Sequence, residues 1–168
     1  MHNGIEFFTA TCLNWQPLFS SDRHKQIILD SLTFLVKEKR IWLYGYVIMP
    51  NHVHLLWCKQ PEWADKNVQQ HFTKFTAQQI KFSMLDNGED MTPYKSTQTD
   101  RQFQFWERRP HIATMYNRRV LEEKLDYIHA NPVKAGLCDL PELYKYSSAG
   151  FYFDNAPNEI ITHYMDHI

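Results

Sequence analysis

Hydrophobic residues recur with two different periods along this chain, and their order predicts alternating strands and helices. Aromatic and β-branched residues dominate 5–13 (IEFFTATCL), 41–49 and 52–58, which is typical of β-strands. Apolar positions recur at helical spacing within 23–40 and 68–85. The first half of the chain therefore predicts a strand, a helix, two strands joined as a hairpin, and a second helix.

The second half has a weaker pattern. Residues 86–101 (DNGEDMTPYKSTQTDR) are polar and rich in turn formers, so we expect a flexible excursion there. Phe103–Trp106 (FQFW) alternates like a short fourth strand, and Asn117 can cap a third helix that runs to about Asn131. This order is the split βαβ arrangement of a ferredoxin-like sandwich, an α+β fold with an antiparallel sheet and one extra C-terminal helix.

Length and composition bound what such a chain can be. Its 168 residues suffice for one domain with a hydrophobic core, so we expect a single domain over 1–168. A hydrophobic content of 43% excludes a disordered chain, and the 15% of aromatic residues suggests rings exposed for stacking. Eighteen basic and nineteen acidic residues give a net charge of −1, so any nucleic-acid site must be a local basic face.

Cysteine use and hydropathy predict a cytoplasmic protein without a membrane partner. Cys12, Cys58 and Cys138 are far apart and form no CxxC motif, which indicates thiols in a reducing cytosol. The N-terminus lacks the basic and apolar regions of a signal peptide. The longest apolar stretch, Ile41–Met49, is too short to span a bilayer.

A His-hydrophobic-His sequence is the first candidate for chemistry. His52 and His54 are two apart in a predicted strand, so their imidazoles project from the same face, about 7 Å apart. Two such imidazoles can share one metal ion, and a third ligand from elsewhere would leave open positions for a substrate. The alternative is a pair of solvated histidines. Cys58 lies on the same face, but about 13 Å further along the strand, which is too far for a shared zinc site without a bulge.

The third predicted helix carries the second candidate. Tyr127 and Asn131 are four residues apart and share a helix face, and Lys124 lies one turn before the tyrosine. A phenol has a pKa near 10 and needs a metal or a base to act as a nucleophile, so a nearby metal would serve both the tyrosine and a phosphate. Alternatively, Tyr127 is a packing residue and Asn131 caps a short turn at 132–137. His129 points away from Tyr127 and is expected to be structural.

Two segments carry a resemblance to a known family. Gly45–Leu56 (GYVIMPNHVHLL) and Tyr127–Gly136 (YIHANPVKAG) closely resemble the IS200-like tyrosine transposases of the Y1, HUH type. The resemblance is strongest to the branch associated with repetitive extragenic palindromes. It extends from about Ile5 to Phe151. The family implies an HUH-type ferredoxin-like fold that acts on single-stranded DNA, usually at hairpins.

The resemblance also implies roles for individual residues. His52 and His54 match the family's metal pair and Tyr127 its nucleophile, while Asn131 matches a third ligand that is Gln in the founding insertion-sequence enzymes. The implied reaction is attack on a backbone phosphate, giving a 5′-phosphotyrosine and a free 3′-hydroxyl, and a second hydroxyl then reverses it. The expected cofactor is Mg²⁺ or Mn²⁺, with no nucleotide cofactor, in agreement with the lack of a GxxxxGK[ST] motif. Related enzymes suggest a homodimer.

Basic residues beside aromatic ones predict where DNA would bind. Arginine and aromatic planes together hold phosphates and stack unpaired bases. The residues assigned to this role are Arg108, Arg109, Arg118, Arg119 and Lys124. The alternative is a solvated helix face that follows a core strand.

Three functions therefore remain open from the sequence. The first is a tyrosine transposase or single-stranded DNA endonuclease. The second is a non-covalent metal-dependent nuclease in which Tyr127 only packs. The third is a single-stranded nucleic-acid binding module without catalysis. A covalent protein–DNA adduct, cleavage without an adduct, and retention without cleavage would distinguish them.

Overall fold

The computed structural model describes residues 4–168, and within them the chain forms a four-stranded antiparallel sheet with helices on both faces. The strand order is β2-β3-β1-β4, which is the order of a ferredoxin-like sandwich, so the predicted α+β fold is confirmed. The elements are β1 (Ile5–Thr11), α1 (Asp22–Lys37), β2 (Ile41–Ile48), β3 (His52–Lys59), α2 (Val68–Asp86), β4 (His111–Thr114), α3 (Arg118–Lys134) and α4 (Ala149–Asp154).

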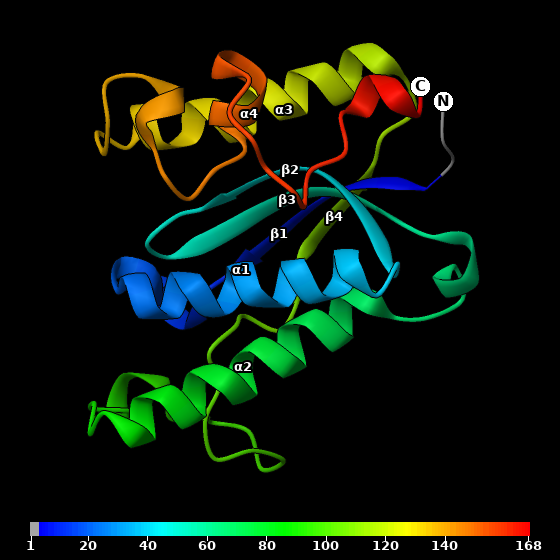
Figure 1. Cartoon of the computed structure of the whole chain (residues 1–168). Coiled ribbons are helices and arrows are strands. Elements are labelled where there is room, and N and C mark those ends of the chain that lie inside the picture. Colours follow the sequence, from blue (N-terminus) through cyan, green and yellow to red (C-terminus); the bar gives the residue numbers. More distant parts are fainter. Residues whose placement is uncertain (1–3) are drawn as a thin grey trace.

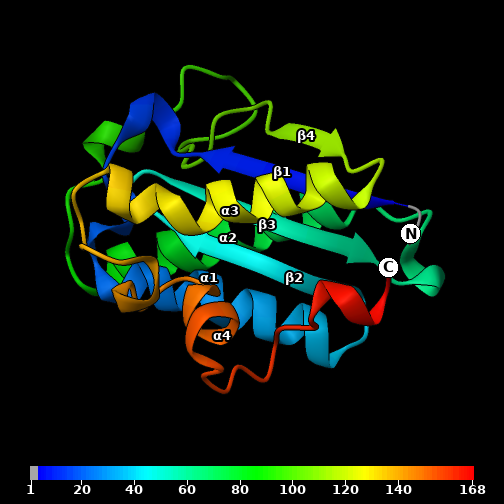
Figure 2. The same cartoon turned by 90° about the horizontal axis from the view of Figure 1, so that it is seen from above.

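The sheet separates two apolar layers because side chains alternate along each strand. Phe8 of β1 packs into the layer between the sheet and helices α1 and α2, whereas Phe7 faces α3 on the opposite side of the sheet. Figure 2 shows α3 lying along the sheet, over β1 and β3. None of the helices within residues 4–168 combines the length and apolar character needed to cross a membrane.

The fourth strand lies at a different place from the one predicted. Phe103–Trp106 forms only isolated bridges, such as the one between Trp106 and Cys12, and β4 is His111–Thr114. β1 ends at Thr11, so Trp106 meets the chain where it leaves the sheet and cannot extend a ladder there. The true edge strand is short and largely exposed, and it therefore lacks the apolar alternation on which the prediction relied.

The predicted excursion is packed against the core at two points. Met91 and Tyr94 are buried and belong to the apolar layer under α1 and α2. The polar residues between and around them remain at the surface, so flexibility stays a prediction for the exposed part of 86–101.

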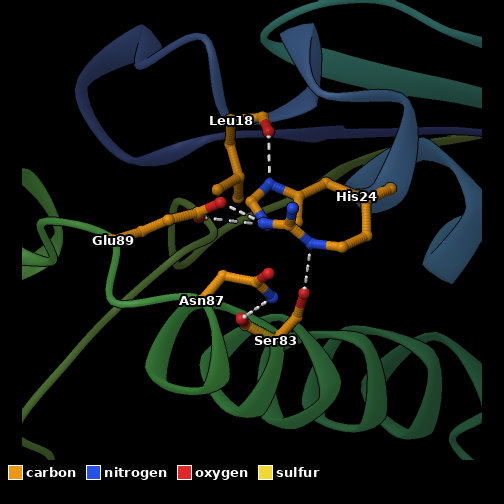
Figure 3. Close-up of polar contacts among 6 residues, drawn as sticks. Leu18, His24, Ser83, Asn87 and Glu89 are labelled. Carbon is orange, nitrogen blue, oxygen red and sulfur yellow. Dashed lines mark hydrogen bonds and ion pairs between the residues drawn. The ribbon is translucent and has the colours of Figure 1, made fainter.

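A polar cluster joins the start of α1 to the end of α2 (Figure 3). His24 Nδ1 lies 2.8 Å from the carbonyl oxygen of Leu18, and its Nε2 lies 3.5 Å from Glu89. Arg23 donates from Nε to Ser83 Oγ at 2.7 Å and also pairs with Glu89. These contacts fix the two helices against each other below the sheet.

The site-bearing helix α3 packs closely on β2 because residue 45 is a glycine. A Cβ atom at Gly45 would come within 2.5 Å of Leu125 Cδ1 and 3.4 Å of Ser148 Oγ. His129 of α3 forms a 2.8 Å hydrogen bond from Nε2 to the same Ser148 hydroxyl, which also bonds the backbone of Tyr46. His129 is therefore structural, as predicted, and it locks α3 to the sheet.

Candidate active site

His54 sits on β3 with one ring nitrogen fixed and the other unpaired. β1 places Thr9 opposite it, and Thr9 Oγ1 lies 2.7 Å from His54 Nδ1. The Nε2 atom is buried and has no hydrogen-bond partner among residues 4–168. Burial lowers the pKa of His54 to about 3, and positive charge from His52, Lys124 and His111 acts in the same direction. The ring is thus neutral at pH 7, which is the form that binds a metal.

His52 lies beside it on the same face, as the strand parity predicts. The two imidazole centroids are 4.7 Å apart, closer than the extended-strand estimate because the rings turn toward each other. His52 Nδ1 is 2.7 Å from Asn51 Oδ1, and its ring also takes part in a side-chain hydrogen bond with Asn131. Burial lowers the pKa of His52, although the bond to Asn131 opposes that shift.

Helix α3 brings Tyr127 to the histidines of the same chain. The ring of Tyr127 is 5.2 Å from that of His54 and 6.0 Å from that of Phe7, and it is 43% exposed. Lys124 Nζ lies over both aromatic rings, 4.9 Å from the centroid of Phe7 and 5.7 Å from that of Tyr127. A tyrosine, a lysine ammonium and a pair of imidazoles therefore meet on one face of the sheet.

Asn131 is part of a continuous helix, so the alternative in which it caps a turn at 132–137 is wrong. α3 runs to Lys134 with Pro132 inside it. Pro132 removes one helical hydrogen bond, yet the helix continues for two residues beyond it. Asn131 thereby stays on the face of Tyr127 and reaches His52.

The donor set fits a divalent cation if an amide completes it. Among residues 4–168, no three His, Cys, Asp or Glu side chains converge as metal ligands. His52 lies beside His54 and shares a side-chain hydrogen bond with Asn131, and a cation at the unpaired buried Nε2 of His54 would satisfy that ring. Cys58 is outside this group, since it pairs with Ile5 at the far end of β3.

The predicted DNA-binding residues divide into three places. Lys124 is at the candidate site, as described above. Arg118 and Arg119 stand at the start of α3 in ion pairs with Glu122 and Glu123, at 2.8 and 3.6 Å. Arg108 and Arg109 are exposed beyond the β4 edge, where they line a cavity of about 780 Å³ with Lys74 and Phe103; Arg108 is 3.5 Å from Asp100.

Sequence reasoning missed the residues that hold the histidines in place. Thr9 and Phe7 both contact His54, and Phe7 stacks on it with centroids 5.3 Å apart. Only the register of β1 against β3 reveals these contacts, and no local pattern encodes it. Asn51 does carry a signal, because it directly precedes His52 within the resembling segment.

Comparison with solved structures shows that other proteins share this fold. The chain is similar to a REP-associated tyrosine transposase solved bound to a REP hairpin, with a TM-score of 0.65, 17% identity, and coverage of 94% of this chain and 84% of that one. It is less similar to a presumed transposase from Deinococcus radiodurans, with a TM-score of 0.49, 14% identity, and coverage of 76% and 90%. No family model and no curated protein matches the sequence. The chain thus has the fold of a tyrosine transposase, in agreement with the resemblance seen in its motifs.

Proposed function

We propose that this chain is a metal-dependent single-stranded DNA transposase that cleaves and rejoins DNA at hairpin-associated sites. One observation carries the proposal: Tyr127 lies 5.2 Å, ring to ring, from His54, whose Nε2 is buried without a partner among residues 4–168. The fold supports it, since the similar transposase was solved bound to a hairpin. A DNA substrate implies a cytoplasmic location.

The proposed reaction conserves the number of phosphodiester-type bonds. The Tyr127 oxygen attacks a backbone phosphorus, a bond between phosphorus and the tyrosine oxygen forms, and the bond to the 3′-oxygen breaks. The phenolic proton is lost and the leaving oxygen gains a proton, which gives a free 3′-hydroxyl and a 5′-phosphotyrosine. A second DNA 3′-hydroxyl then attacks the phosphotyrosine and releases Tyr127. No nucleotide cofactor is needed.

Residues around Tyr127 supply the rest of the chemistry. His52, His54 and Asn131 would hold Mg²⁺ or Mn²⁺, which when bound offsets charge on the phosphate oxygens. Thr9 and Asn51 keep the two imidazoles in orientation. The Lys124 ammonium, 5.7 Å from the tyrosine ring, favours both phenolate and phosphate.

Tyr127→Phe tests the nucleophile. The substitution removes only a hydroxyl from a 43% exposed side chain, so the melting temperature and DNA affinity should stay close to wild type. Labelled hairpin oligonucleotides from the flanks of the chain's own gene are incubated with protein and Mg²⁺ and separated on a denaturing gel. Wild type should form a covalent adduct that EDTA prevents, and Tyr127→Phe should form none.

The same gel separates the other two functions. Cleavage without an adduct would favour the metal-dependent nuclease, and binding without cleavage would favour the binding module. An adduct that persists in Tyr127→Phe would rule out this tyrosine as the nucleophile.

A further inference from the structure

The turn after β1 exposes a tryptophan in a strained backbone. Trp15 is 63% exposed, although its indole is the largest side chain type in proteins. Its φ is +56°, and that of Asn14 before it is +52°. Two successive left-handed residues without a glycine are uncommon, and a bulky aromatic side chain in that region is an outlier. Such strain persists where the surrounding structure holds it, and it concentrates at functional sites.

Hydrogen bonds from two other parts of the chain hold this turn. The amide of Leu13 donates to the carbonyl of Phe105 at 2.8 Å, and the amide of Asn14 donates to Glu107 Oε1 at 2.8 Å. Within the turn, the amide of Trp15 donates to the carbonyl of Cys12 at 2.9 Å. These hydrogen bonds therefore hold the indole at the surface, and its position does not depend on burial of the ring.

Trp15 ends a row of rings that begins at the proposed nucleophile. The register of β1 and β3 places Thr9 opposite His54 and Thr11 opposite His52, so the row passes beyond the end of β1 toward Trp15. The Trp15 ring lies 6.1 Å from that of His52, at 72°. Tyr127 is at the other end, beside His54.

We propose that Trp15 stacks on an unpaired base, that of the nucleotide directly 5′ of the phosphate attacked by Tyr127. The inference rests on the proposed function. In an in-line displacement the leaving 3′-oxygen departs opposite the attacking oxygen. The nucleoside that carries this oxygen therefore points away from Tyr127, past the histidines and toward Trp15. An exposed indole there gives its base a stacking surface without selecting its hydrogen-bonding edge.

An abasic scan tests the contact. Each position of the single-stranded tail of the hairpin oligonucleotide is replaced by an abasic nucleotide, and both equilibrium binding and adduct formation are measured. For wild type, the abasic nucleotide directly 5′ of the cleaved phosphate should weaken binding by roughly 5- to 150-fold. Trp15→Ala should show the same loss on the intact oligonucleotide and little further loss with that abasic position. Trp15→Phe should keep most of the affinity.

Controls distinguish stacking from a structural role. Phe82→Ala removes a 47% exposed aromatic residue of α2, on the opposite side of the sheet, and should change neither measurement. Trp15→Gly relieves the left-handed backbone, so it should raise the melting temperature while it weakens binding. If Trp15 served only the fold, Trp15→Gly would lower both the melting temperature and the affinity for the oligonucleotide.

The two proposals fail in different ways. The stacking proposal is overturned if Trp15→Ala binds the oligonucleotide as tightly as wild type. It is also overturned if, at every tail position, the loss of affinity from Trp15→Ala and the loss from the abasic nucleotide multiply as independent effects. If wild type binds the hairpin but forms no adduct, the transposase function fails, and the binding scan still decides whether Trp15 is coupled to one base.

Discussion

At the scale of single residues, one hydroxyl would orient His54 toward the proposed metal. Nε2 can bind a cation only if the ring proton is on Nδ1, and Thr9 Oγ1 lies 2.7 Å from that nitrogen, where it can accept the proton's hydrogen bond. Thr9→Val keeps the shape but leaves Nδ1 without this acceptor. Loss of such a supporting bond typically costs 10- to 100-fold in metal affinity or activity. We expect that loss for Mn²⁺ binding measured by calorimetry and for the rate of adduct formation.

Thr9→Ser provides the matched control. It keeps the hydroxyl and removes only a methyl group, so it should retain most of the wild-type affinity. Equal Mn²⁺ binding by Thr9→Val and wild type would mean that β1 does not orient His54.

The spacing of residues within one strand or helix predicts some of these site residues but not others. Strand parity places His52 and His54 on one face, and helix spacing places Tyr127 beside Asn131, because both rules act within one element. Thr9 reaches His54 through the pairing of distant strands, and Trp15 reaches His52 through a turn held by 105–107. Those contacts depend on register, which the sequence of either partner alone does not encode.

At the scale of elements, the distance between α3 and the sheet sets the position of Tyr127. Gly45→Val should improve strand propensity, yet a Cβ there would stand 2.5 Å from Leu125 Cδ1. The overpacking should lower the free energy of unfolding by about 1–3 kcal/mol and reduce adduct formation. Urea denaturation and the adduct assay measure the two effects. The double variant Gly45→Val, Leu125→Ala should recover part of the activity, because it removes the side chain that the valine would meet. If Gly45→Val alone were as stable and active as wild type, the close packing of α3 on β2 would be contradicted.

The burial of His129 makes the attachment of α3 sensitive to acid. Burial lowers the pKa of His129 to about 4, below the ordinary value near 6.5, so the folded state disfavours the protonated ring. The stability that depends on the neutral ring is complete above pH 6.5. It is lost as the pH falls from 6.5 to 4, because over that range the unfolded chain binds a proton that the folded chain does not. His54 acts in the same direction, with a pKa of about 3.

Urea denaturation in EDTA at several pH values measures this effect. Wild type should lose stability between pH 6.5 and 4, by up to about 3 kcal/mol for His129 alone. His129→Gln should be less stable at pH 7 and should show a shallower dependence on pH. A variant with the wild-type slope would show that the acid sensitivity arises elsewhere.

The elements themselves were largely predictable, and the exception has a physical cause. Helical periodicity located α1, α2 and α3, and runs of aromatic and β-branched residues located β1, β2 and β3. Phe103–Trp106 has the composition of a strand and is buried except for the partly exposed Phe103. Its neighbour β1 has already ended, so the segment forms isolated bridges and no ladder. β4 is a short and largely exposed edge strand, so it has no alternation of apolar and polar residues by which the sequence could predict it.

At the scale of the whole molecule, α3 places Tyr127 beside the histidine pair of its own chain. Tyr127, the histidine pair and Asn131 all come from the same chain, so the geometry does not require helix exchange between protomers. A homodimer remains a prediction from the family resemblance. Light scattering would test it, and a monomer that forms the adduct would show that the dimer is not needed for cleavage.

The charge of the whole chain predicts which DNA it prefers. With a net charge of −1, it cannot rely on a broad field to hold a duplex, whose bases are already stacked on one another. Affinity should come from a few phosphate contacts and from stacking on exposed aromatic rings, each stacked base contributing roughly 1–3 kcal/mol. We therefore expect tighter binding to hairpins with single-stranded tails than to fully paired DNA of the same sequence.

The dependence of this binding on salt should be shallow, and single cations should contribute unequally. Each neutralised phosphate of a single strand adds about 0.7 to the slope of log affinity against log salt. Lys124 faces the site, so Lys124→Ala should flatten the slope by about that amount. Arg118 and Arg119 already pair with Glu122 and Glu123, so their alanine variants should weaken binding less. Mobility shifts at several salt concentrations measure all four proteins; equal affinity for duplex and tailed hairpin, or a steep slope, would place the source of binding in bulk charge instead.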